Sequence, residues 1–156
     1  MMLGKEMHQF AKELWPINRS ITGEGVRQTL KIISNHLPKL KIKSVSSGTK
    51  VFDWSIPKEW EVKKAYIITP DGKKICDFSE NNLHLVGYST SFSGDLSLDE
   101  LKKHLHTLPQ QPNAIPYVTS YYEERWGFCI SQNEYDNLIE GEYKVFIDSN
   151  NWRLFI

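Results

Sequence analysis

Apolar and polar positions at the start of the chain recur with the spacing of helices. Apolar side chains return every three or four positions between residues 5 and 15, and again from Val26 to Leu37, as they do on one face of an amphipathic helix. Pro16 and Pro38 follow the two runs, and proline disfavours continuation of a helix. We therefore predict two N-terminal helices, the second with Thr22 as its N-cap.

From Leu40 onward the apolar period shortens to two, which is typical of strands. Strands are predicted over residues 40–45, 51–54, 60–62, 65–69, 74–78, 83–88 and 143–147. Asp71-Gly72 favours the positive φ of a tight turn, so residues 65–78 should form a hairpin. Short helices are expected at 98–105, after Ser97, and at 134–138. Two helices followed by a mainly antiparallel β domain with short helices define an α+β protein.

Residues 115–129 form the stretch richest in aromatic side chains, and we predict two strands there on either side of Glu123-Glu124-Arg125. Large rings with polar tips serve either as a core whose hydroxyl groups are satisfied or as the wall of a binding site. Tyr121, Tyr122 and Trp126 are therefore candidate binding residues. Both interpretations stay open at this point.

Composition narrows the classes of partner. The 156 residues carry 19 basic and 19 acidic side chains, so no basic field favours nucleic acid or an anionic membrane. Charged residues near the N-terminus precede any apolar run long enough for a signal peptide, and no later window is long and apolar enough for a membrane span. We predict a cytoplasmic protein with neither nucleic acid nor membrane as a partner. Cys76 and Cys129 lack a CxxC partner and are expected to be buried free thiols.

Known catalytic signatures are missing from the sequence: there is no Gly-rich phosphate loop, GxSxG elbow or HExxH motif. Asn18 and Arg19 precede the second predicted helix, where free amides and a guanidinium group could hold an anion. Plain capping and an ion pair are the favoured explanation of this loop. His84 lies between two leucines and should face away from them, either as a hydrogen-bonded structural histidine or as a functional one.

Four segments together are similar to a known family: residues 14–27, 51–60, 82–89 and 115–129. They resemble a bacterial family of zinc-aminopeptidase-like proteins of the di-zinc exopeptidase type, which carries domains of unknown function and is often found near surface-polysaccharide genes. The similarity extends from about Lys5 to Ser149. It implies a hydrolase larger than this chain, with an α/β peptidase domain, an inserted mainly β domain and a winged-helix segment at the far end.

The resemblance implies a domain division and a metal. Residues 1–48 would be an incomplete helical segment of the peptidase domain, 49–149 the inserted domain, and 150–156 an atypical tail. The zinc ligands of the family lie beyond the insert, in a Cys-His-Pro-Ser-like motif that this sequence lacks, so no cofactor is expected in this chain. The loss of pattern after Ser149 suggests a truncated or frameshifted product, or a genuine short form.

Two functions follow as hypotheses. In the first, the chain is the N-terminal portion of a zinc aminopeptidase-like protein, inactive alone, with its insert capping a substrate cleft. Its partner would be a second copy of itself or a separately encoded C-terminal peptidase part. In the alternative, the chain is a stand-alone module that recognises a glycan or peptide through its aromatic face.

Overall fold

The chain divides into two compact units. The computed structural model describes residues 2–120 and 123–152. The first unit comprises the chain up to Glu61 together with residues from Asn151 onward, and the second is Val62–Asn150. The boundary that the resemblance implies, between residues 48 and 49, refers to insertion into a larger domain, which packing within this chain does not test. It stays a prediction.

The two predicted N-terminal helices are confirmed in the first unit. They are α1 (Met2–Leu14) and α2 (Glu24–His36), and the rings of Phe10 and His36 meet edge to face at 4.7 Å. The predicted N-cap is wrong, because α2 is preceded by Gly23 at φ 111° without a side-chain cap. The Thr22 hydroxyl donates instead to the Lys58 carbonyl.

Residues 41–45 do not form the predicted strand. Leu40, Ile42 and Val45 are 38–55% exposed, and within the described residues no strand pairs with them. The first strands are β1 (Lys50–Val51) and β2 (Trp54–Ser55), which pair as a short hairpin with Val51 opposite Trp54. Residues 52–53 are the turn of this hairpin, so the predicted strand over 51–54 is divided.

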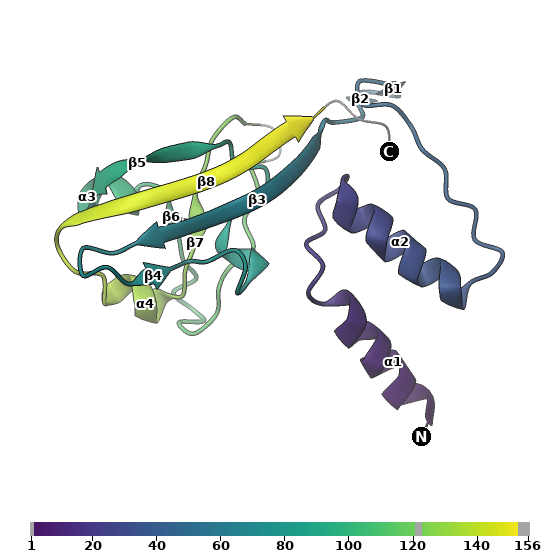
Figure 1. Cartoon of the computed structure of the whole chain (residues 1–156), viewed down its shortest axis with the longest axis horizontal. Helices are drawn as coiled ribbons and strands as arrows, with labels where there is room; N and C mark the ends of the chain where they lie inside the picture. Colours follow the sequence, from purple (N-terminus) through teal and green to yellow (C-terminus); the bar gives the residue numbers. More distant parts are fainter. Residues whose placement is uncertain (1, 121–122, 153–156) are drawn as a thin grey trace. The chain divides into compact units, whose positions relative to one another are not determined.

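A four-stranded sheet forms the second unit's framework, in the order β4-β3-β8-β5. Its strands are β3 (Glu59–Ile68), β4 (Lys74–Ile75), β5 (Phe92–Ser97) and β8 (Glu142–Trp152). β3 pairs antiparallel with β4, and β5 with β8, while Figure 1 shows the long strands β3 and β8 running in opposite directions. The predicted α+β class is confirmed.

Along parts of the two long strands, buried side chains alternate with more exposed ones, and these buried side chains build the core of the second unit. Ala65 and Ile67 of β3, with Tyr143, Val145 and Ile147 of β8, are at most 2% exposed. A small parallel pair, β6 (Leu105–His106) and β7 (Phe128–Cys129), contributes buried side chains from the loops. Because one sheet face is buried and the other is not, the period of two was a reliable signal in these strands.

Local turn and cap signals also predicted the hairpin and the start of α3. Ile67 pairs with Ile75, and Gly72 has a φ of 83° in the turn between them. Ser97 and Glu100 form a reciprocal capping box at the start of α3 (Leu98–Lys102), as the sequence pattern favours. α3 ends earlier than predicted, since Leu105 enters β6. The last helix, α4 (Gln132–Asp136), begins after the N-cap Ser131.

The strand predicted over residues 83–88 is wrong, and of the two strands predicted within 115–129 only the second is present among the described residues. Residues 82–84 form a 3₁₀ helix, η1 (Asn82–His84), because the side chain of Asn81 accepts the Leu83 amide and turns the chain. Leu85 and Gly87 make only single bridges, to Phe128 and Thr119. Among the described residues of 115–129, only Phe128–Cys129 is a strand. The described part of the chain contains no helix long and apolar enough to cross a membrane.

Candidate functional site

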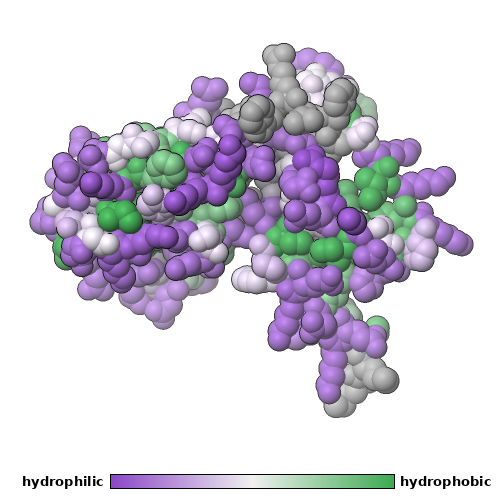
Figure 2. Space-filling model, viewed as in Figure 1, coloured by the Kyte–Doolittle hydropathy of each residue, from purple (hydrophilic) through white to green (hydrophobic). Residues whose placement is uncertain are grey.

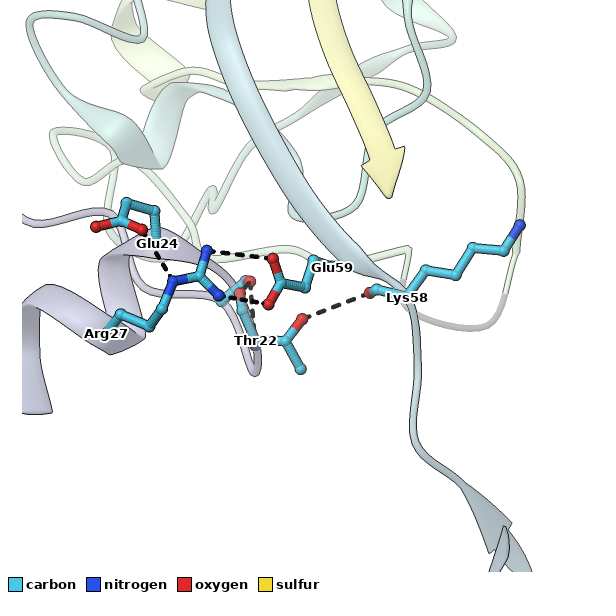
Figure 3. Close-up of polar contacts among 6 residues, drawn as sticks. Thr22, Glu24, Arg27, Lys58 and Glu59 are labelled. Carbon is cyan, nitrogen blue, oxygen red and sulfur yellow. Dashed lines mark hydrogen bonds and ion pairs between the residues drawn. The ribbon is translucent and has the colours of Figure 1, made fainter. Parts of the chain in front are cut away.

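Arg27 joins α2 to the beginning of β3. Its Nη1 and Nη2 atoms donate to the two carboxylate oxygens of Glu59 at 2.6 and 3.3 Å, and its Nε donates to Glu24 at 2.9 Å (Figure 3). Glu59 is 5% exposed, and a bidentate guanidinium is the cation best matched to a buried carboxylate. The hydrogen bonds that Arg27 donates to Glu59, and then the one that it donates to Glu24, raise the pKa of Arg27 above its ordinary value.

The loop before α2 is fastened to the same strand start. Thr22, 2% exposed, donates to the Lys58 carbonyl at 3.4 Å (Figure 3). At Gly23, a Cβ atom would lie 3.4 Å from the Trp60 carbonyl oxygen, and its φ of 111° favours glycine. Because the Arg27 group and both carboxylates satisfy one another, this cluster fixes the helix to the strand rather than presenting a free charge.

Asn18 and Arg19, the predicted anion-binding pair, contact different parts of the first unit. Arg19 Nη1 donates to the Leu14 carbonyl at 2.7 Å, which satisfies one of the free carbonyls at the end of α1. The Asn18 carbonyl lies against Gly25, where a Cβ atom would come within 1.8 Å of its oxygen. The guanidinium therefore serves the C-terminus of α1, and anion binding at the N-terminus of α2 stays a prediction.

His84 is buried inside the second unit, 9% exposed. Its Nδ1 lies 2.9 Å from the Cys129 carbonyl oxygen, and since a carbonyl only accepts, Nδ1 carries the proton in this contact. The ring thereby joins η1 to β7. This is the geometry of the structural histidine, one of the two roles expected for it.

Trp126 lies between two other rings. Phe92 stacks on it with centroids 4.2 Å apart and His104 with centroids 3.7 Å apart, both nearly parallel to the indole. Two parallel rings at such distances would overlap if they shared one face, so they cover opposite faces of Trp126. The indole in this structure has no free face for a ligand. The two tyrosines predicted to accompany it, Tyr121 and Tyr122, lie outside the described residues.

A network of buried serines holds the surrounding loops. Ser89 Oγ donates to the Val86 carbonyl at 2.7 Å and accepts the Gly127 amide at 3.2 Å, while Ser149 Oγ donates to the Ser89 carbonyl at 2.7 Å. Both the amide and the hydroxyl of Ser120 contact the Gly87 carbonyl. Sequence reasoning missed these serines and His104, because their partners are distant in sequence and no local pattern marks them.

The two thiols are poor metal ligands as they stand, whereas His106 is biased toward the neutral form that a metal would bind. Burial raises the pKa of Cys129 to about 11 and that of Cys76 further still, which disfavours the thiolate that a metal requires. Burial, and then the charges of Arg125 and His104, lower the pKa of His106. Within residues 2–120 and 123–152, no three His, Cys, Asp or Glu side chains are grouped to hold one metal ion.

The observations define an α+β protein in which α2 of the first unit is tied to residues 58–59 of that unit, and buried serines tie the loops of the second unit. Residues 59–150 match the family described as "Domain of unknown function (DUF2172)", and the chain belongs to this family.

Relatives of known name come from Clostridium acetobutylicum. One, named "Putative polysaccharide biosynthesis protein with aminopeptidase-like domain", is 52% identical over 147 residues, which make up 94% of this chain and 34% of the relative. A crystal structure titled as a "putative peptidase" is 50% identical, with a TM-score of 0.93 over 99% of this chain and 37% of that one. This chain thus spans about a third of the length of these proteins, whose names agree with the aminopeptidase-like resemblance.

Proposed function

We propose that this chain forms the N-terminal portion of a zinc aminopeptidase-like protein and does not hydrolyse peptides by itself. The carrying observation is the match of 94% of the chain to only 34% of a relative named for its aminopeptidase-like domain, at 52% identity. About two thirds of such a protein therefore consists of polypeptide that this chain does not match. In this proposal the zinc ligands belong to that remainder.

The chemistry of the described residues supports this division. Hydrolysis by metal-activated water needs about three protein ligands and an open coordination position. Here the Nδ1 of His84 is engaged by a carbonyl, and burial raises the pKa of both thiols. The second unit would contribute a cap over the substrate cleft of the peptidase part, with Trp126 offering an edge rather than a face.

The alternative, a stand-alone module that binds a glycan or peptide, has no comparable support. Of its three candidate rings the structure describes only Trp126, and both faces of that indole are covered by Phe92 and His104. A ligand would have to displace one of these rings before it could stack on the indole.

Zinc content and peptidase activity test the proposal. The full chain, the C. acetobutylicum relative, and a chimera in which this chain replaces the matching 147-residue segment of the relative would be compared for bound zinc and for hydrolysis of aminoacyl 4-nitroanilides. We expect bound zinc and hydrolysis for the relative and for the chimera. The chain alone should show neither bound zinc nor hydrolysis. Stoichiometric zinc with hydrolysis by the chain alone would overturn the proposal, as would a chimera that fails to fold when the relative folds.

A further inference from the structure

We propose that the β1–β2 hairpin presents Phe52 as an anchor that docks on the polypeptide making up the other two thirds of the relatives' length. This inference rests on the proposed function and deepens it, because it names the contact through which the chain is joined to the peptidase part. It is carried by three observations: the backbone of Phe52, its exposure, and the distribution of apolar surface along the chain.

The backbone at Phe52 has an unfavourable conformation for its residue type. Phe52 has a φ of 55° at the first position of a two-residue turn between the paired residues Val51 and Trp54. A hairpin turn with positive φ at this position is normally occupied by glycine, because a Cβ atom is crowded there. A phenylalanine is therefore retained here against the local preference of the backbone.

No packing by the described residues compensates for this. The Phe52 side chain is 100% exposed, so its ring gains no packing in the isolated chain. A strained residue that persists without local compensation points to a function outside the element that carries it. For a fully solvated aromatic ring at the tip of a hairpin, the function that suits it is insertion into an apolar pocket of a partner.

Apolar exposure is concentrated in the same unit. Among the described residues, twelve large hydrophobic side chains are exposed, of which ten precede residue 62; Tyr117 and Ile139 are the other two. Of the buried hydrophobic residues in the part of the chain whose burial is described, Trp60 alone belongs to the first unit. Figure 2 shows apolar residues gathered on the visible face around α2. Exposed apolar surface of this kind marks a contact that the isolated unit does not make.

The relatives indicate which partner covers this surface. The matched segment is 94% of this chain, and in the relative it is accompanied by nearly twice its own length of additional polypeptide, since it is 34% of the whole. That remainder is present once for every copy of the segment, so it is a partner of fixed stoichiometry. A second copy of the chain is the competing occupant, and the experiment separates the two.

The anchor is tested by one substitution whose effect on the melting temperature should have opposite signs in the isolated chain and in the chimera. Phe52→Gly relieves the positive φ and removes the ring. In the isolated chain it should raise the melting temperature by about 2 °C. If the hairpin opens locally, the same stabilisation should appear as slower hydrogen exchange of its amides. In the chimera defined above, the same change should lower the melting temperature by about 2 °C or more, because a buried ring is lost. Phe52→Tyr should behave like the parent in both backgrounds, and Tyr117→Ala, at an exposed ring in the second unit, should be neutral in both.

Each outcome bears on a different claim. Equal effects of Phe52→Gly in a folded, active chimera and in the isolated chain would overturn the anchor while leaving the proposed function intact. A chimera that does not fold, or a chain that hydrolyses peptides alone, would overturn the proposed function and the anchor with it. A dimer of the isolated chain that Phe52→Gly dissociates, measured by sedimentation velocity, would assign the anchor to a second copy and overturn the occupant proposed here.

Discussion

The ion pair between Arg27 and Glu59 should control the opening of α2. The perturbation is Arg27→Met, which keeps an unbranched apolar stem but removes the guanidinium. Glu59 would then keep its carboxylate at a position where its side chain is only 6% exposed. A buried carboxylate without a partner is unfavourable, so helix opening that hydrates Glu59 becomes easier.

The magnitude follows from the unequal burial of the two partners. Removing one member of a fully buried pair destabilises by about 3–5 kcal/mol, whereas exposed pairs contribute about 0.2–1 kcal/mol. Arg27 is 43% exposed and Glu59 is 6% exposed, so we expect about 1–3 kcal/mol for Arg27→Met. Glu59→Gln keeps an oxygen acceptor and should lose about 1–2 kcal/mol. The double variant should lose less than the sum, by about 1–2 kcal/mol of coupling.

Hydrogen–deuterium exchange measures this locally. Peptides covering Glu24–His36 report the opening of α2 in the parent, the two single variants and the double variant, and about 1.4 kcal/mol corresponds to a tenfold faster exchange. Two controls are available in the chain. Glu24→Gln removes an exposed i,i+3 pair with Arg27, and Arg125→Met removes an exposed pair with Glu123 whose atoms are 3.5 Å apart. Each control should change exchange by less than about threefold.

Any of three results would contradict the reasoning. Exchange of α2 in Arg27→Met within twofold of the parent would show that the buried carboxylate does not depend on its partner. Single variants whose effects simply add in the double variant would show that Arg27 and Glu59 act through other contacts. If Glu24→Gln accelerated exchange of α2 as much as Arg27→Met does, Glu24 rather than Glu59 would be the carboxylate that holds the helix.

Three further predictions follow from individual residues. Gly25→Ala should destabilise the first unit by about 2 kcal/mol or more, because its Cβ atom would lie 1.8 Å from the Asn18 carbonyl oxygen; Gly4→Ala, with open space around it, should stabilise by about 0.5 kcal/mol in urea titrations. Lys74, then Ser79, lower the pKa of Asp77 to about 2, so acidification from pH 4.5 to 2 should remove about 1–2 kcal/mol of stability, a slope that is absent in Asp77→Asn. Cys76 and Cys129 are buried with raised pKa values, so a disulfide reagent at pH 8 should modify them only as fast as the chain opens, and rapid modification of native protein would contradict their burial.

Short-range signals in the sequence predicted the elements that depend on short-range contacts. Pro16 ends the period of the first helix, Gly72 permits the hairpin turn, and the side chains of Ser97 and Glu100 cap α3 with no help from distant residues. Strands were predictable only where a partner exists. Leu40 and Ile42 alternate with lysines as in a real strand, but they have no neighbouring strand among the described residues.

The candidate site depended on contacts that no local pattern encodes. Arg19 and Arg27 both lie near the start of α2, and sequence reasoning named only Arg19, as a candidate for anion binding beside plain capping and an ion pair. Their different roles are set by Glu59, which is 32 positions from Arg27 and pairs with it, while Arg19 reaches back to the end of α1. Trp126 was identified as a ring of interest, but Phe92 and His104, which cover its faces, are brought to it only by the fold.

Polar and apolar groups of the first unit have separate tasks if the anchor at Phe52 is correct. The contacts of Arg27 and Thr22 with Glu59 and Lys58 hold α2 and its preceding loop to the start of β3 within this chain, and they leave the apolar side chains uncovered. An ordered element with an exposed apolar surface loses less conformational entropy on docking than a disordered one. Arg27→Met should therefore accelerate hydrogen exchange of α2 in the isolated chain and, through the loss of α2, also lower the melting temperature of the chimera. Phe52→Gly should lower the melting temperature only in the chimera. Because the two residues would act at different steps, their effects on the chimera should add, and strong coupling between them would show that the clamp and the anchor are one contact.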